Sequence, residues 1–143
     1  MEIDDIYSEL VMEHSQNSPY KKDIKNPTCS VHGHNPNCGD DITLSFVIEN
    51  GIIKDVSFTG QGCAISQSST SIMIETLIGK TIKEAQKIID IFIDLIDRKQ
   101  VSKEDKKLLK NAQIFKNISN MPARVKCALL AWKTTKNILN EQN

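Results

Sequence analysis

The clearest pattern of hydrophobic and polar positions lies in the middle of the chain. Apolar residues alternate with polar ones in residues 42–48, and again in residues 52–58. Alternation with a period of two is typical of a half-buried β-strand, because successive side chains point to opposite faces. Asn50-Gly51 separates the two runs, and this pair favours a type I′ turn in which both residues take positive φ. The pattern predicts a β-hairpin, which a third strand or packed helices must complete because two strands alone are marginal.

Residues before the hairpin form two segments of different character. In residues 3–14 the apolar side chains recur at the spacing of one helix face, which predicts an amphipathic helix. Residues 16–36 hold three of the four prolines and show little periodicity. We therefore expect a loop there, with a short extended piece near residues 28–32.

Helical start and stop signals fill the chain from residue 64 onward. Gly79 can end one helix, and Thr81 with Glu84 matches the capping box that begins the next. Pro122 fits the first turn of a final helix. The fold class predicted is therefore α+β: a small antiparallel sheet of about three strands packed against helices, in one domain over residues 1–143.

Composition narrows the classes of function. Hydrophobic residues make up 39% of the chain, and 18 Lys and Arg balance 18 Asp and Glu to a formal charge of zero. Without a basic excess we expect no nucleic-acid partner, since such binding relies on phosphate contacts. No segment approaches the roughly 20 apolar residues of a transmembrane helix, and the N-terminus lacks the pattern of a signal peptide. We therefore expect a cytoplasmic protein without a membrane partner.

Four cysteines add chemistry to this picture, because a reducing cytoplasm disfavours disulfides and leaves thiols for metal or sulfur chemistry. Cys38 precedes the first hairpin strand and Cys63 follows the second, so the hairpin brings both to one end of the sheet. Cys63 opens a helix, where unpaired N–H groups favour a thiolate, and Cys127 lies early in the last helix. With Asp40, these thiols form a candidate Cys₃Asp site of a kind that suits zinc and iron–sulfur species.

Spacing alone leaves two other interpretations open. Cys63 and Cys127 also fit buried hydrophobic positions, a common place for free cysteine. A competing local cluster with zinc-like spacing consists of Cys29, His32, His34 and Cys38. That cluster leaves the glycines before Cys63 unexplained.

Three segments around these residues carry a family resemblance. They read NPNCGD at residues 35–40, GQGCAIS at residues 60–66 and PARVKC at residues 122–127. In this order they resemble the signature segments of the IscU/NifU-N-terminal family of iron–sulfur cluster assembly proteins, over nearly the whole chain. The resemblance implies a three-stranded antiparallel sheet with packed helices. It also implies that Cys38, Asp40, Cys63 and Cys127 are metal ligands.

Three details resemble the SufU-type branch of that family. Lys126 stands where the housekeeping scaffold has a histidine before its third cysteine, and residues 121–125 do not match the scaffold's chaperone-recognition segment. The interval that contains residues 98–115 resembles the extra segment of SufU-type proteins. By this resemblance the chain holds zinc and accepts sulfur from a SufS-type cysteine desulfurase.

The resemblance also implies roles for single residues. Cys38, on a loop, is the expected mobile ligand that accepts persulfide sulfur and passes it to downstream cluster assembly or acceptor proteins. Arg124 lies one helical turn before Cys127, where it either supports Asp40 or a thiolate or faces solvent. Cys29, His32 and His34 receive no role in the site.

Two alternative functions use the same residues. The first is an IscU-type scaffold that assembles a [2Fe–2S] cluster there, with iron in place of zinc. The second is a structural zinc domain that binds a partner protein. Whether the chain counts as an enzyme, a zinc-dependent sulfurtransferase, depends on which of these holds.

Overall fold

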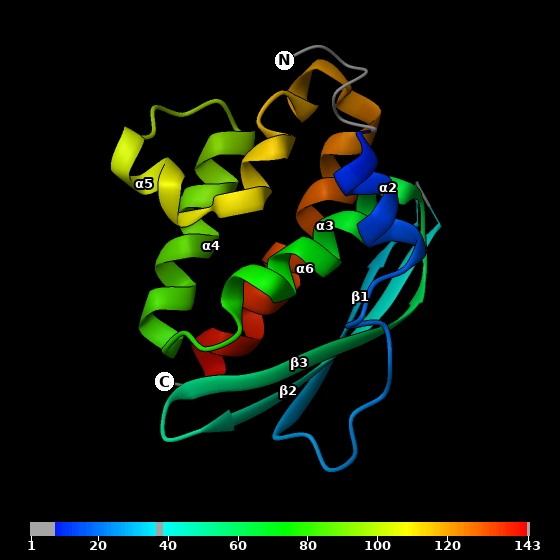
Figure 1. Cartoon of the computed structure of the whole chain (residues 1–143), viewed down its shortest axis with the longest axis vertical. Coiled ribbons are helices and arrows are strands. Elements are labelled where there is room, and N and C mark those ends of the chain that lie inside the picture. The colour runs from blue at the N-terminus through cyan, green and yellow to red at the C-terminus, as the bar shows by residue number, and fades with distance from the viewer. Residues whose placement is uncertain (1–7, 37–38, 143) are drawn as a thin grey trace.

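The computed structural model describes residues 8–36 and 39–142 and shows a three-stranded antiparallel sheet packed against helices (Figure 1). The sheet order is β1-β2-β3. The strands are β1 (Cys29–Asn35), β2 (Asp40–Glu49) and β3 (Ile52–Gln61). The predicted α+β fold is confirmed.

The hairpin forms where the alternating pattern predicts it. Ile42, Leu44 and Phe46 of β2 are fully buried, while the residues between them are more exposed. Asn50 and Gly51 take φ angles of 54° and 73°, the positive values that a type I′ turn requires. The apolar face of the hairpin therefore points to the helices, and both strand ends that carry site residues meet at the opposite end from the turn.

The third strand is longer than the sequence predicts. β1 pairs with β2 from Cys29↔Phe46 to Asn35↔Asp40. The extended piece expected near residues 28–32 is therefore confirmed, and the expectation of a loop is wrong for residues 33–35, where the strand continues. Gly33 and Asn35 occupy buried positions where a strand usually carries large apolar side chains. A Cβ at Gly33 would lie 2.6 Å from Thr134 Oγ1, so close helix packing excludes the side chain that would have revealed the strand.

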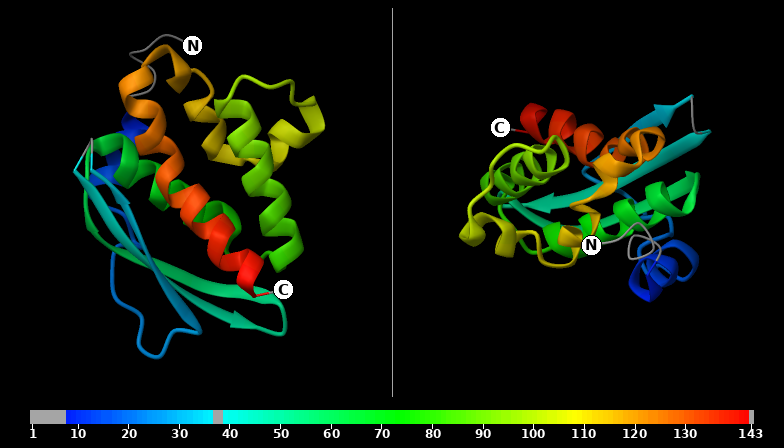
Figure 2. Two further views of the ribbon diagram at one scale, coloured as in Figure 1. Left: turned by 180° about the vertical axis from the view of Figure 1, so that it is seen from behind. Right: turned by 90° about the horizontal axis from the view of Figure 1, so that it is seen from above.

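The C-terminal half forms the helices that its sequence signals predict. The helices are α3 (Ala64–Leu77), α4 (Ile82–Ile96), α5 (Lys103–Leu108) and α6 (Pro122–Glu141), with 3₁₀ helices η1 (Lys110–Phe115) and η2 (Ile118–Asn120) before α6. Thr81 and Glu84 form the predicted capping box, and Pro122 occupies the first turn of α6. α6 lies between α3 and α4 (Figure 2).

Aromatic side chains join these helices in the core. Phe92 of α4 stacks on Trp132 of α6 with ring centroids 3.9 Å apart, and Phe115 of η1 meets Phe92 edge-on at 6.3 Å. All three side chains are fully buried. The segment 98–115 therefore contributes to the core through η1. No helix in the described ranges is long and apolar enough to cross a membrane.

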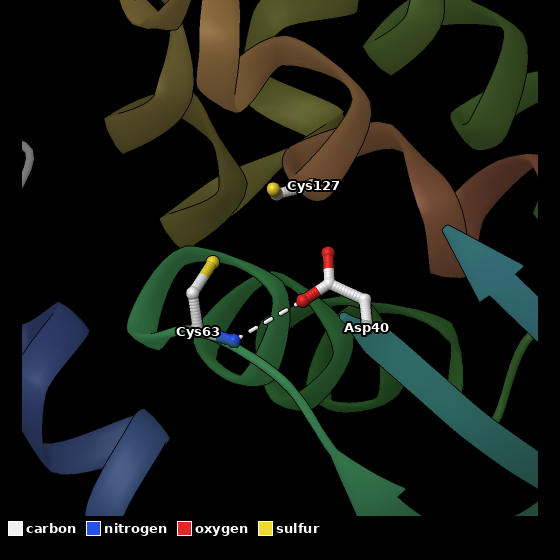
Figure 3. A group of neighbouring side chains, drawn as sticks. All are labelled: Asp40, Cys63 and Cys127. Atoms are coloured by element: carbon white, nitrogen blue, oxygen red, sulfur yellow. Dashed lines mark hydrogen bonds between the residues drawn. The ribbon is translucent and has the colours of Figure 1, made fainter. Parts of the chain in front are cut away.

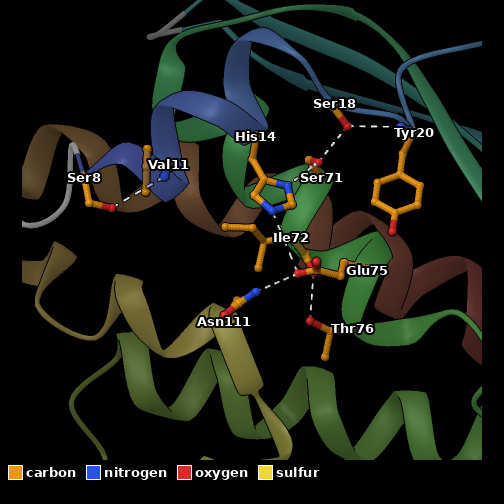
Figure 4. Close-up of polar contacts among 10 residues, drawn as sticks. All are labelled: Ser8, Val11, His14, Ser18, Tyr20, Ser71, Ile72, Glu75, Thr76 and Asn111. Atoms are coloured by element: carbon orange, nitrogen blue, oxygen red, sulfur yellow. Dashed lines mark hydrogen bonds and ion pairs between the residues drawn. The ribbon is translucent and has the colours of Figure 1, made fainter.

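The first described helix, α2 (Glu9–Gln16), packs on α3 through polar contacts (Figure 4). His14 Nδ1 lies 2.7 Å from Ser71 Oγ, which also lies 2.6 Å from Ser18 Oγ. A continuous helix over residues 3–14 is wrong, because Ser8 is extended and caps α2 by accepting the Val11 N–H. The rest of that prediction, residues 3–7, lies outside the described residues.

Candidate metal centre

Asp40 is the first residue of β2 and is completely buried. Its Oδ1 accepts hydrogen bonds from the Cys63 N–H at 3.1 Å and from the Ser66 hydroxyl at 2.9 Å. Its Oδ2 is buried without a hydrogen-bond partner and points toward Cys127 (Figure 3). A buried carboxylate oxygen left unpaired is costly, so Oδ2 is an atom whose bonding a bound cation would complete.

Cys63 is the N-cap residue of α3. Its backbone is extended, with φ −73° and ψ 170°, and its Sγ accepts the Ser66 N–H at 3.5 Å. The first N–H groups of a helix have no partner within the helix, so a side chain at the N-cap can accept a hydrogen bond from them. The sequence therefore positions a half-buried sulfur, ready to act as a ligand, directly after β3.

Cys127 lies in the first turns of α6 and is 1% exposed. One ligand atom from each of Asp40, Cys63 and Cys127 lies within 4.8 Å of the other two. Of the residues that the structure describes, no others form such a group of three or more His, Cys, Asp or Glu side chains. The three come from β2, α3 and α6, so the tertiary fold, and not one local motif, builds this group (Figure 3).

These residues fit a metal ion. Two thiols and one carboxylate form a donor set that suits zinc and iron. The unpaired Asp40 Oδ2 supplies an oxygen whose bonding a cation would complete. Cys38, the further predicted ligand, lies outside the described residues.

The other residues of predicted interest lie around this centre. Arg124 is half-buried on α6, in the turn before Cys127, and its role in supporting a ligand stays a prediction. Lys126 is exposed.

The competing cluster does not form among its described members. Cys29, half-buried, is on the face of β1 turned to the core, whereas His32 and His34 are exposed on the alternate face and stack with centroids 6.2 Å apart. His32 is bonded to Asp41 at 2.6 Å. Burial, and secondarily Glu141, raise the pKa of the Cys29 thiol, which disfavours its thiolate form.

Ser66 is the residue that sequence reasoning missed. It ends the quoted segment 60–66 but received no role, although its hydroxyl and its N–H contact Asp40 and Cys63. One signal was available, because the third residue of a helix commonly meets the side chain of the N-cap residue. The bond to Asp40 depends on how β2 packs against α3, which the spacing along the chain does not reveal.

Comparison with known proteins places this fold and these residues in a family. Residues 6–128 match the family described as the NifU-like N terminal domain. The chain belongs to this family. The match includes all the residues of the centre, from the segment before Asp40 to Cys127.

Relatives within the NifU-like N-terminal family carry two kinds of name. The chain is 38% identical over 136 residues to the iron–sulfur cluster assembly scaffold protein IscU of Thermotoga maritima, covering 95% of this chain and 94% of that protein. It is 36% identical over 131 residues to the zinc-dependent sulfurtransferase SufU of Bacillus subtilis, covering 92% and 87%. The two relatives are named for different roles, and this chain is almost equally identical in sequence to both.

A solved structure supports the same family placement. The crystal structure of a putative iron–sulfur cluster assembly scaffold protein for the SUF system from Fervidobacterium islandicum superposes with a TM-score of 0.88 at 40% identity. The match covers 94% of this chain and 96% of that one.

Proposed function

We propose that this protein is a zinc-bound sulfur acceptor in iron–sulfur cluster assembly, and that it takes persulfide sulfur from a SufS-type cysteine desulfurase through Cys38. The carrying observation is the group of buried Asp40, half-buried Cys63 and buried Cys127, with Asp40 Oδ2 left unpaired. Exposed Lys126 beside Cys127 supports the sulfur-acceptor role, because by the family resemblance it replaces a scaffold histidine that can ligate metal.

The protein's own residues would hold the ion through Asp40, Cys63 and Cys127, with Cys38 as the remaining ligand. When bound, zinc keeps its ligating thiols as thiolates and contributes no redox chemistry. Helix α3 and the backbone around Cys63 hold Asp40 and Cys63 in place through hydrogen bonds. Only Gly39 separates Cys38 from Asp40, so the proposed sulfur acceptor is two residues away in sequence from a fully buried ligand.

The sulfur-transfer step is thiol–disulfide chemistry at Cys38. The Cys38 thiolate attacks the terminal sulfur of the desulfurase persulfide, and a new S–S bond forms on this protein. The S–S bond of the donor breaks, and the donor cysteine leaves as a thiolate. The step needs no outside oxidant, because sulfur with its oxidation level moves from one thiolate to the other. Downstream assembly or acceptor proteins would then take the sulfur from Cys38.

A second candidate function is assembly of a [2Fe–2S] cluster on the same residues. The 38% identity to a protein named as an IscU scaffold favours it. Thiolates and a carboxylate suit iron as well as zinc, so the described ligand atoms fit both. Metal and sulfide analysis of protein purified without oxygen separates the two. One zinc per chain without sulfide supports the acceptor, and iron with labile sulfide supports the scaffold.

The test of the proposed function is replacement of the acceptor thiol. Cys38→Ser should abolish the stimulation of desulfurase turnover and the persulfide label on this protein. Cys29→Ser is the matched control, because Cys29 lies on β1 outside the metal group and should keep both properties. Undiminished stimulation by Cys38→Ser would contradict the role given to this residue.

A further inference from the structure

Ser66 contacts two residues of the candidate metal centre at once. It is the third residue of α3 and is 1% exposed. Its backbone N–H donates to Cys63 Sγ at 3.5 Å, and its Oγ lies 2.9 Å from Asp40 Oδ1. Both contacts join atoms of the protein alone.

The single hydroxyl proton of Ser66 has two acceptors in reach. Besides Asp40 Oδ1, the Cys63 carbonyl oxygen lies 3.0 Å away. That carbonyl already accepts the Gln67 N–H at 3.0 Å in the first turn of α3. A carboxylate is also the stronger acceptor, because charge-assisted hydrogen bonds are about twice as strong as neutral ones. The Ser66 hydroxyl therefore donates its proton preferentially to Asp40 Oδ1.

This bond leaves the two oxygens of Asp40 unequal. Oδ1 accepts both the Ser66 hydroxyl and the Cys63 N–H, whereas Oδ2 has no partner. Gly62 packs against the Oδ1 side of Asp40, since a Cβ there would lie 2.6 Å from Asp40 Oδ1 and closer still to Ser66 Oγ. The carboxylate is thus held by one oxygen, and only the other is available to a ligand.

We propose that Ser66 is a positioning residue that makes Asp40 bind metal through Oδ2 alone. The proposal rests on the metal site of the proposed function and adds how its carboxylate ligand is oriented. A carboxylate limited to one oxygen favours an ion with few ligands, such as four-coordinate zinc, over ions that take both oxygens. Without the Ser66 hydroxyl, Oδ1 also becomes available to the ion.

The first experiment measures zinc affinity by competition with a coloured chelator in purified, metal-free protein. Ser66→Ala should weaken zinc binding by about 10- to 100-fold, the range typical of lost outer partners of metal ligands. Ser68→Ala is the matched control, because Ser68 is equally buried in α3 but donates to the Ile65 carbonyl, away from the centre. Equal affinity of Ser66→Ala and wild type would overturn the proposal.

A double-mutant cycle separates positioning from general structural support. In an Asp40→Ala background, Ser66→Ala should no longer change zinc affinity, because its effect passes through Asp40. If Ser66→Ala weakens binding equally in both backgrounds, the residue acts without Asp40 and the proposal is overturned. Wild-type protein that binds zinc no better than Asp40→Ala would instead contradict the proposed metal site.

Cobalt substitution gives a spectroscopic readout that a loss of stability alone does not change. Binding of both carboxylate oxygens raises the number of ligands, so the visible cobalt bands of Ser66→Ala should be weaker than those of wild type. Identical bands would overturn the proposal. If Ser66→Ala does not fold, Ser66→Thr keeps the hydroxyl and should retain wild-type bands, whereas weakened bands in a folded Ser66→Thr protein would count against it.

Discussion

Gly62 lies beside the metal centre at a point with no room for a side chain. A methyl group there would lie 2.6 Å from Asp40 Oδ1 and would also meet Ser66 Oγ. Both of these atoms are buried and bonded to each other, so neither can move without breaking the contact that fixes Asp40. Gly62 is exposed between β3 and α3, yet the buried atoms beside it leave no room for a larger residue.

We expect Gly62→Ala to weaken zinc binding by about tenfold, because it displaces the carboxylate and its hydroxyl partner. Zinc affinity by chelator competition measures the effect.

Gly51→Ala is the control for this glycine. Gly51 has φ 73° and nothing within 4 Å, so alanine there should lower the free energy of unfolding by ~1–2 kcal/mol and leave zinc affinity unchanged. Unchanged zinc affinity in Gly62→Ala would contradict the prediction, because it would mean that Asp40 and Ser66 tolerate a methyl group at this position.

Single residues also show what the sequence could and could not predict about the centre. Cys63 and Cys127 were predictable, because their places next to helix starts follow from turn and cap signals. The bond between Ser66 and Asp40 was not, since it joins residues from β2 and α3 whose contact arises only when the sheet and helix pack. The ligand roles of Cys38, Asp40, Cys63 and Cys127 stay predictions.

At the scale of elements, local signals predicted most starts and ends correctly. The capping box at Thr81 and Glu84 and the Asn50-Gly51 turn depend on neighbouring residues alone, so the sequence reveals them. β1 was underestimated because its packing positions hold Gly33 and Asn35, whose fit depends on α6. The start of α2 was misplaced because an amphipathic pattern runs past the serine that caps the helix.

The capping box of α4 gives a pH-dependent prediction. Hydrogen bonds from the backbone and the side chain of Thr81 lower the pKa of Glu84 from its ordinary value of 4.5. A carboxyl group with a lowered pKa stabilises the fold above its ordinary pKa, and this contribution is lost as pH falls through the lowered value. Glu84→Ala should therefore unfold at lower urea concentration than wild type at pH 7, with a difference that shrinks in acid.

Urea titrations followed by circular dichroism at pH 7 and at successively lower pH measure this difference. Lys83→Ala, an exposed neighbour in the same helical turn, serves as the control and should show no such convergence in acid. A difference for Glu84→Ala that stays constant down to strongly acidic pH would contradict the role of the charged carboxylate.

For the whole molecule, the centre joins three separate parts of the fold. Asp40 begins β2, Cys63 caps α3 and Cys127 lies early in α6, so an ion bound to all three links the sheet to both helices. The sequence predicted the α+β class because strand and helix periodicities occupy different halves of the chain. It did not predict how α6 lies between α3 and α4, which depends on long-range packing. That residues 1–143 form one domain stays a prediction.

Metal removal should therefore lower the stability of the entire fold. Zinc that binds only the folded state stabilises it by ~2.7 kcal/mol when free zinc is 100 times its dissociation constant. We expect a strong chelator to lower the melting temperature of zinc-loaded wild type, measured by circular dichroism. Asp40→Ala should lose fewer degrees on chelation than wild type, because its remaining thiols bind zinc more weakly. A wild type whose melting temperature does not change with chelator would contradict the linkage.

Trp132 is the only tryptophan of the chain, and its surroundings make it an internal optical probe. Its ring stacks on Phe92 of α4, and its Nε1–H donates to Ser69 Oγ of α3 at 3.0 Å. Ser69 in turn donates to the carbonyl of Ala128, the residue after Cys127. The indole of Trp132 therefore lies where α3, α4 and α6 meet. Its fluorescence emission should report the packing of these helices around the metal centre without any added label.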